Sequence, residues 1–154
     1  MSVPIPAPTS ESIPEPTSLY SKAILSKSVS IPFTMVGSNI REVLQKQLVE
    51  SFEGKCIKEG FVRPKSISIL TYSSGMCKHQ NILFQVTFSC IVCFPVEGMK
   101  IRILITNITK AGIRGKSRDP YSPIDVFIAR DHNINNLSYQ NAKLDDELFV
   151  VIVG

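Results

Sequence analysis

The sequence predicts an α+β protein made of two β-rich parts, and three observations support this prediction. Apolar and polar residues alternate with a period of two over several stretches, the longest running from Ile82 to Phe94. One segment, residues 40–52, instead repeats its apolar residues at helical spacing. A Pro–Gly interruption at residues 95–98 separates the part that contains this helix from a part with strand patterns only.

Residues 1–18 are expected to form a disordered tail. They contain five of the ten prolines of the chain, and proline removes backbone donors and favours extended polyproline geometry. A flexible tail is the simplest interpretation of this Pro/Ser-rich composition, and a docking peptide for a partner is the alternative.

The first part, residues 19–95, is predicted to combine a sheet with one helix. Strand patterns run over residues 19–31, 67–71 and 82–94, with a turn signal in "YSSG". The helix is expected to begin after Asn39, which forms a capping-box pattern with Glu42, and to end near Gly54. Its apolar face is formed by Ile40, Val43, Leu44, Leu48 and Phe52.

The second part, residues 96–154, is predicted to contain only strands. Strand patterns recur at residues 101–105, 113–119, 124–128 and 148–153. A polar, Asn-rich connection over residues 133–143 precedes the last of them. Four strand patterns without a helical one make this an all-strand half.

The composition limits the possible function classes. With 154 residues, of which 44% are hydrophobic, the chain can bury one good core or two small ones. It has no apolar run of about 18 residues and no secretory signal pattern, so we expect no membrane partner. Its four cysteines are then expected to be reduced thiols of an intracellular protein. The net charge of +4 is weak support for a polyanionic partner.

Cys90 and Cys93 form a Cys-x-x-Cys, which raises the question of a metal or redox site. A zinc site needs a second ligand pair, and a redox pair normally opens a helix. Residues three apart on a strand instead point to opposite faces. We therefore expect packing cysteines, no metal and no cofactor. The remaining candidate ligands are all single: Cys56, Cys77, His79 and His132.

Catalytic motifs are not apparent either. The chain has no nucleophile elbow, phosphate loop or dinucleotide fingerprint. Asp131 and His132 are neighbours in the sequence, and such pairs are usually surface features rather than catalytic pairs. We expect no catalytic residue and no enzymatic activity in this chain.

Basic residues gather in the second part, between Gly98 and His132, where only three acidic residues oppose them. A small barrel with a basic face and some aromatic rings is how OB-folds bind single-stranded nucleic acid, with phosphates on Lys and Arg and bases on the rings. A solvated charged face is the alternative interpretation. The candidate RNA-binding residues are Arg102, Lys110, Arg114, Lys116, Phe127, Arg130 and His132.

Six segments, in order from Ile31 to Gly154, resemble one known family. They are "IPFTMVGSNIREVLQKQLVESFEGKC", "EGFV", "FQVTFSCIVCFPVEGM", "ITNITKAGIRGK", "SPIDVFIARDH" and "LDDELFVVIVG". No single segment is specific, but together they are similar to the stalk subunit of multisubunit DNA-directed RNA polymerases. This is the seventh subunit of the eukaryotic enzyme, which has a direct counterpart in the archaeal one. The spellings "EGKC", "FPVEGM" and "ITKAGI" are most similar to versions from large DNA viruses.

This resemblance implies a polymerase-docking tip domain at residues 19–95 and an OB-fold β-barrel at residues 96–154 that faces emerging RNA. It implies a non-catalytic role. The implied partners are the core subunits near the clamp, single-stranded RNA and a small helical companion subunit. It places the protein in the virion and host cytoplasm if it is viral, and otherwise in the nucleus. The implied docking residues are Phe33, Gly37, Gly54, Lys55, Gly60 and Phe61.

The chain departs from the family pattern at two places. Ile113 stands where many OB-folds of this type carry an aromatic residue. The chain also stops at Gly154, where the family continues into a final barrel strand. Either the sequence is a fragment, or the barrel is an open, shortened form that needs a partner to cover its edges.

Two other functions stay open. One is a free-standing OB-fold RNA-binding or translation-type factor, which would bind RNA without a polymerase partner. The other is a thiol or metal enzyme, and stoichiometric zinc in the purified protein would overturn the interpretation of the cysteines as packing residues.

Overall fold

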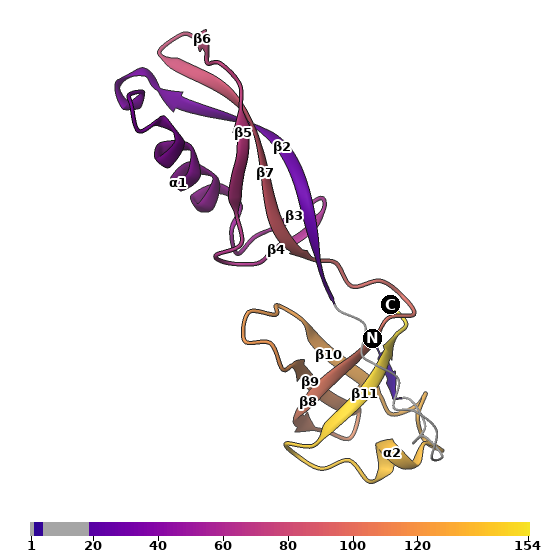
Figure 1. Cartoon of the computed structure of the whole chain (residues 1–154). Helices are drawn as coiled ribbons and strands as arrows, with labels where there is room; N and C mark the ends of the chain where they lie inside the picture. The colour runs from indigo at the N-terminus through magenta and orange to yellow at the C-terminus, as the bar shows by residue number, and fades with distance from the viewer. Residues whose placement is uncertain (1, 5–18) are drawn as a thin grey trace. The chain divides into compact units, whose positions relative to one another are not determined.

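The computed structural model describes residues 2–4 and 19–154, which fall into two compact units. The first is Tyr20–Phe94, called here the ribbon unit, and the second is Pro95–Gly154 together with the N-terminal residues, called here the Greek-key unit. Each is built around an antiparallel sheet (Figure 1). No helix among the described residues is long and apolar enough to cross a membrane.

The ribbon unit is built on two long strands. β2 (Tyr20–Pro32) and β7 (Asn81–Cys93) pair antiparallel over all thirteen of their residues. Four short strands complete the sheet: β3 (Cys56–Ile57), β4 (Gly60–Val62), β5 (Ser68–Tyr72) and β6 (Met76–Lys78). Three of these, β4, β5 and β6, pair with successive parts of β7, and β3 pairs with β4.

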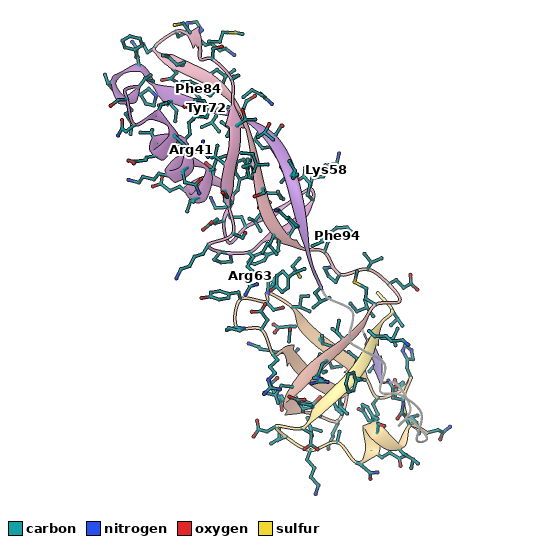
Figure 2. The ribbon with its side chains drawn as sticks, in the orientation of Figure 1. Arg41, Lys58, Arg63, Tyr72, Phe84 and Phe94 are labelled. Atoms are coloured by element: carbon teal, nitrogen blue, oxygen red, sulfur yellow. The ribbon has the colours of Figure 1, made fainter. Side chains whose placement is uncertain are left out.

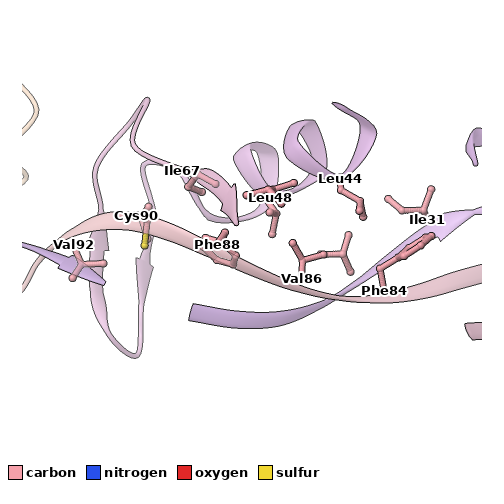
Figure 3. Close-up of a cluster of buried hydrophobic side chains, with 12 residues drawn as sticks. Ile31, Leu44, Leu48, Ile67, Phe84, Val86, Phe88, Cys90 and Val92 are labelled. Carbon is pink, nitrogen blue, oxygen red and sulfur yellow. The ribbon is translucent and has the colours of Figure 1, made fainter. Parts of the chain in front are cut away.

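The helix α1 (Ile40–Phe52) covers one face of this sheet, as its apolar spacing predicts. Leu44 and Leu48 are fully buried there, against the alternate residues of β7 that face the same way (Figure 3). The ring of Phe52 stacks on Phe88 of β7, with the ring centroids 5.9 Å apart. The predicted period-two strand and the predicted helix face are therefore both confirmed, and together they form the core of this unit.

Polar side chains also attach the helix to β5. Arg41 Nη2 donates a hydrogen bond to the carbonyl of Ile69 (2.8 Å), and Gln45 Nε2 donates one to the carbonyl of Ile67 (2.7 Å). Beside this attachment, Tyr72 of β5 and Phe84 of β7 meet edge to face (Figure 2). The two hydrogen bonds satisfy the carbonyl of Ile67, just before β5, and that of Ile69, where β5 has a bulge between Ile69 and Thr71.

The two ends of α1 differ in how well the sequence predicts them. The helix begins directly after Asn39, but the Asn39 side chain makes no capping hydrogen bond, so the predicted capping box is wrong. The Asn39 backbone, with φ −96° and ψ 24°, is not in the extended conformation that directs the side chain back to the helix. At the other end, Gly54 has φ 68°, the left-handed conformation that the predicted C-terminal glycine supplies.

The Greek-key unit contains four strands from the C-terminal half of the chain. They are β8 (Lys100–Ile108), β9 (Gly112–Ser117), β10 (Asp125–Ala129) and β11 (Glu147–Ile152). The spatial order β11-β8-β9-β10 is that of a Greek key, because the last strand returns beside the first. Ile103, Ile105, Ile113, Ile128 and Val150 are fully buried in its core.

Two features of this unit differ from the all-strand prediction. A short helix, α2 (Leu137–Gln140), lies in the Asn-rich connection, where the Asn136 side chain accepts a hydrogen bond from the Ser138 backbone (3.0 Å). Ser2–Pro4, within the predicted tail, form strand β1, which pairs with β11. Backbone pairing along a sheet edge does not depend on composition, so the proline content of this segment does not reveal it. The rest of the predicted tail, residues 5–18, lies outside the described residues.

Candidate nucleic-acid interface

A groove of about 520 Å³ crosses strands β8, β9 and β10 of the Greek-key unit. Three of the predicted RNA-binding residues lie in its lining, Arg114 and Lys116 of β9 and Phe127 of β10. We call this hollow the sheet groove. Its remaining lining residues are Thr106, Asn107, Gly115, Asp125 and Val126.

Strand register brings a cation and an aromatic ring together in the sheet groove. Arg114 is the direct partner of Phe127 on β10 and of Asn107 on β8. Directly opposed residues have Cβ atoms about 4.5–5.5 Å apart, so their side chains are neighbours on one face. Arg114 is exposed and Phe127 is half-buried. This pairing offers a positive charge for a phosphate beside a ring on which a base can stack.

The second cation of this groove has a partner of opposite charge. Lys116 faces Asp125 across β9 and β10, with Nζ and Oδ1 3.8 Å apart. Both side chains are largely exposed, so this ion pair contributes little and is easily exchanged for another anion. A phosphate approaching Lys116 would still have to compete with the Asp125 carboxylate.

Two backbone features shape the groove. The register of β8 against β9 shifts between Ile105 and Asn107, a bulge that redirects the following side chains. Gly115 leaves no room for a side chain: a Cβ atom there would lie 2.6 Å from Ile103 Cδ1 and 2.9 Å from the Leu104 carbonyl oxygen. The glycine therefore allows close packing of β8 against β9 at the base of the groove.

A second hollow, of about 350 Å³, lies beside the β8–β9 turn and α2, and we call it the turn groove. It is lined by the predicted residues Lys110 and Arg130, and by Tyr139 of α2. Arg130 Nη1 donates a hydrogen bond to the Lys110 carbonyl (3.5 Å), and the Arg130 backbone N–H donates one to Ala111 (3.0 Å). The two cations are thus held at adjacent positions, although they come from different strand connections.

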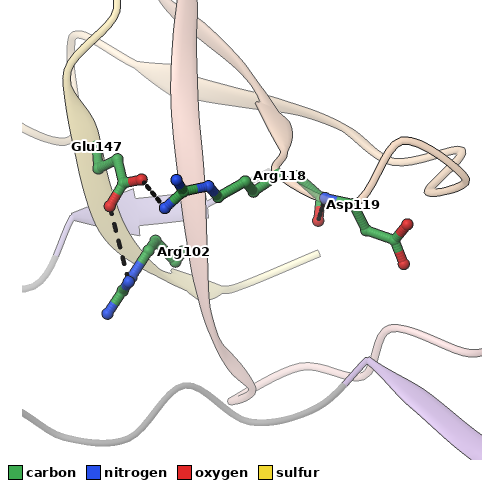
Figure 4. Close-up of polar contacts among 5 residues, drawn as sticks. Arg102, Arg118, Asp119 and Glu147 are labelled. Carbon is green, nitrogen blue, oxygen red and sulfur yellow. Dashed lines mark hydrogen bonds and ion pairs between the residues drawn. The ribbon is translucent and has the colours of Figure 1, made fainter.

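Arg102 and His132, the other two predicted residues, are not among the lining residues of either groove. Arg102 lies next to Glu147 of β11 (3.7 Å), which also accepts a hydrogen bond from Arg118 at 2.7 Å (Figure 4). The Arg102 guanidinium further lies over the Phe149 ring, 4.8 Å from its centre. Its charge is therefore already engaged within the protein. His132 is exposed in the connection after β10.

Sequence reasoning missed two aromatic residues of this unit, Tyr139 and Phe149. Tyr139 lies in a segment whose Asn-rich composition predicts a loop, and α2 brings it to the turn groove. Phe149 is part of the predicted strand, but only the β8–β11 register places it opposite Arg102. No local pattern in the sequence signals either contact.

The six predicted docking residues do not form one surface of the ribbon unit. Phe33 and Gly37 follow the end of β2, where Pro32 pairs with Asn81 at the start of β7. The other four lie at the far end of β7, where Phe61 pairs with Cys93. Thirteen residues of β-strand separate the two groups by roughly 40 Å. The residues of the second group are Gly54, Lys55, Gly60 and Phe61.

The end that carries Phe33 has exposed apolar side chains, which we call the apolar end: Phe33, Met35 and Met76. Their exposed fractions are 65%, 52% and 69%. Phe33 and Met35 form a short 3-10 turn, and the Phe33 N–H donates to the Gln80 carbonyl (3.1 Å) beside the β6–β7 turn. Exposed apolar side chains gathered in this way typically mark an interaction site.

Outside the apolar end, an ion pair joins β2 to the β3–β4 turn. Lys27 Nζ and Glu59 Oε1 lie 3.3 Å apart. A backbone hydrogen bond at Glu59 lowers the pKa of this carboxyl group, and Lys27 lowers it further, whereas desolvation opposes both. Glu59 is therefore charged at neutral pH.

The cysteines divide into two buried and two exposed thiols. Cys90 and Cys93 are both buried on β7, but only Cys90 belongs to the apolar cluster under α1. Burial raises the pKa of the Cys90 thiol, and the charge of Glu59 adds to this shift. Cys56 and Cys77 are exposed. Among the described residues, no group of three or more His, Cys, Asp or Glu side chains is arranged to hold a metal ion.

Known proteins similar to this chain share one description. A protein of Acanthamoeba polyphaga mimivirus named as DNA-directed RNA polymerase subunit L376 is 31% identical over 128 residues, which are 80% of this chain and 61% of that protein. DNA-directed RNA polymerase II subunit 7 of Arabidopsis thaliana is 22% identical over 79% of this chain and 68% of its own length. Subunit RPB7 of Glycine max is 20% identical, covering 82% and 70%. No protein-family model matches the chain.

Proposed function

Because the chain belongs to the family of DNA-directed RNA polymerase stalk subunits that includes subunit 7, we propose that it docks on the core enzyme and contacts nascent single-stranded RNA. In this proposal the chain has no catalytic step of its own and takes part in transcription by binding. The ribbon unit is the docking part and the Greek-key unit is the RNA-binding part.

The proposal for the Greek-key unit is that it works as an OB-fold. Its four C-terminal strands follow the Greek-key order that OB-folds also use, and the sheet groove lies over β8, β9 and β10. OB-folds bind oligonucleotides over their second and third strands, which correspond here to β9 and β10. The observation that supports this most directly is the Arg114–Phe127 pair inside the groove.

Replacing Arg114 by Glu is expected to weaken binding of a labelled single-stranded RNA oligonucleotide by roughly tenfold, measured by fluorescence anisotropy over a series of salt concentrations. One phosphate contact on a single strand contributes about 0.7 to the slope of log affinity against log salt, so this slope should fall by about that amount. Arg114 is the cation to test because it is exposed in the groove beside Phe127.

The matched control is Lys143→Glu, which changes the net charge equally at an exposed residue of the same unit that is not among the lining residues of either groove. Equal losses in the two variants would mean that RNA responds to net charge only. The assignment of the sheet groove would then be wrong. Lys110→Glu tests the turn groove in the same assay, and Phe127→Leu removes the ring while keeping an apolar side chain.

For the ribbon unit we propose that the apolar end is the surface that meets the core enzyme. The opposite group of predicted docking residues is less suited, because Gly54 and Gly60 have positive φ angles and serve the chain's own turns. The apolar end instead offers side chains whose burial would stabilise a complex, at about 25 cal/mol for each Å² of apolar surface. A small helical companion subunit is the further partner that we expect in such a complex.

Phe33→Asp is expected to abolish co-purification of the large polymerase subunits with the tagged chain, because a carboxylate would have to be buried at the apolar end. Mass spectrometry of affinity-purified complexes measures this. The control is Ile24→Asp, since Ile24 is equally exposed (64%) but lies in the first half of β2, away from the apolar end. Retention of the core subunits by Phe33→Asp would exclude this surface. RNA binding by the wild-type chain without any core subunit would favour the free-standing RNA-binding factor.

A further inference from the structure

The turn groove differs from the sheet groove in the aliphatic side chains around it. Ile108, at the end of β8, and Ile134, in the connection before α2, both line the groove and are exposed. The fully buried Ile113 of β9 also contributes to the lining. Exposed apolar side chains gathered beside a hollow typically mark an interaction site, so the turn groove offers a partner apolar surface as well as charge.

The two cations of the turn groove have no acidic partner within the protein. Among the residues that the structure describes, no Asp or Glu side chain forms an ion pair with Lys110 or Arg130. In the sheet groove, by contrast, Lys116 is paired with Asp125. Lys110 and Arg130 are both exposed. A carboxylate that reaches the turn groove therefore meets two positive charges without having to displace an acidic side chain of this protein.

Hydrogen bonds of the protein itself hold both walls of the turn groove. In the β8–β9 turn, the Thr109 N–H donates to the Gly112 carbonyl (2.9 Å). In the connection to α2, Gln140 Nε2 donates to the Ile134 carbonyl (2.5 Å). Asn133, which is almost entirely buried, ties this connection to the end of β10 through its side-chain amide (2.8 Å). The walls are thus formed before a ligand arrives, which reduces the entropic cost of binding.

The lining of the turn groove suits a protein segment better than RNA. Single-stranded RNA binds by stacking its bases on aromatic rings, but among the described lining residues only Tyr139 has a ring, and it is half-buried. A large apolar side chain of a peptide would instead cover the exposed isoleucines. Ligand pockets usually measure about 300–1,000 Å³, so the volume of about 350 Å³ fits such an anchor side chain.

We propose that the turn groove binds an acidic peptide segment of another protein. One large apolar side chain of this segment packs between Ile108 and Ile134, and its neighbouring carboxylates pair with Lys110 and Arg130. The Greek-key unit then has a protein-binding site that is separate from the sheet groove. This inference does not depend on the proposed polymerase function, because it uses only the residues of the turn groove.

Selection of short random peptides, displayed on phage, on the full-length chain tests this proposal. The enriched peptides are expected to combine Asp or Glu with a large apolar residue. The most enriched peptide, synthesised with a fluorescent label, is expected to bind roughly tenfold more weakly to Lys110→Glu and to Ile134→Asp, measured by fluorescence anisotropy. Absence of enrichment, or enriched peptides without acidic residues, would overturn the proposal.

The matched controls are Lys100→Glu and Leu144→Asp. Both residues are exposed in the same unit and neither lines the turn groove, and Leu144 is exposed to nearly the same extent as Ile134, 60% against 56%. The controls are expected to bind the peptide as the wild type does. Losses as large as those of Lys110→Glu and Ile134→Asp would mean that the peptide responds only to net charge, against the proposed site.

A labelled single-stranded RNA oligonucleotide separates the two classes of ligand. Ile134→Asp and Leu144→Asp change the charge equally, so both are expected to bind this RNA with the same affinity. A roughly tenfold weaker affinity of Ile134→Asp alone would assign the turn groove to RNA and overturn the proposal. The substituted side chains are exposed, so the protection of the β8 and β9 amides should match the wild type. If Ile134→Asp is unstable, Lys110→Glu against Lys100→Glu gives the same comparison.

Discussion

Phe88→Ala is expected to lower the free energy of unfolding of the ribbon unit by about 3–5 kcal/mol, the usual range for a fully buried phenylalanine. Phe88 is entirely buried at the centre of β7, and its ring stacks on Phe52 of α1. Removing the ring leaves a cavity between helix and sheet, so the loss includes both the transfer of the side chain and the unfilled volume. Domains of this size are stable by only about 5–15 kcal/mol, so this is a large fraction.

Hydrogen exchange of the β7 amides under increasing urea measures this loss within the ribbon unit. Phe94→Ala is the matched control, because Phe94 is 54% exposed and its removal is expected to change stability by about 0.5 kcal/mol or less. Amides of β8 and β9 report on the other unit, and their protection should not change in either variant. If Phe88→Ala had no more effect than Phe94→Ala, the packing of α1 on β7 would be wrong.

Gly60→Ala is expected to destabilise the same unit through the backbone. Gly60 has φ 131°, a conformation that L-residues rarely adopt and that costs about 1–3 kcal/mol. A Cβ atom at this position would also lie 2.6 Å from the Cys93 carbonyl oxygen, so the end of β7 would have to move away from β4. Strain and displacement act together, which makes this the most severe single-methyl change that we expect in the ribbon unit.

Gly54→Ala separates the two causes, because Gly54 also has a positive φ of 68° but nothing lies within 4 Å of its Cβ position. We expect Gly54→Ala to cost about 1–2 kcal/mol from the left-handed backbone alone, and Gly60→Ala to cost more. Urea unfolding followed by circular dichroism ranks the two variants. Equal losses would show that the close approach to Cys93 relaxes without cost.

The same pair of variants clarifies the role of Gly60, one of the predicted docking residues. Loss of core subunits together with loss of stability would mean that the glycine acts through the fold of the β3–β4 turn. A stable Gly60→Ala protein that no longer co-purifies with the core would instead indicate a direct contact at this end of the ribbon unit, in addition to or in place of the apolar end.

The sequence predicts the long elements well because each covers several periods of its pattern. Thirteen residues of β7 show six alternations, and α1 shows its apolar face over more than three turns. The strands β3, β4 and β6 have only two or three residues, which is too short for any period to appear. β1 is missed for a different reason, since its pairing is made by the backbone within a proline-rich segment.

The sequence predicts which basic residues form the candidate site, but it does not predict how they are arranged. Charge counting along residues 98–132 finds the cations, and strand parity places Arg114 and Lys116 on one face. Neither observation can show that Arg102 forms an ion pair with Glu147 and lies over the ring of Phe149. Both partners come from β11, and these contacts depend on which strands become neighbours. The division of the basic residues into a sheet groove and a turn groove follows from the same long-range pairing.

The distribution of the thiols has a practical consequence for spectroscopy. Cys56 and Cys77 are exposed near opposite ends of β7, since Cys77 pairs with Ile82 and Cys56 pairs with Phe61 beside Cys93. Along the strand this separates them by roughly 35 Å, a span well suited to fluorescence energy transfer or electron-spin distance measurements. The buried pair stays out of reach of maleimide reagents. The native chain therefore already carries two labelling points with which the length of the ribbon, free or in a complex, can be measured without engineering a cysteine.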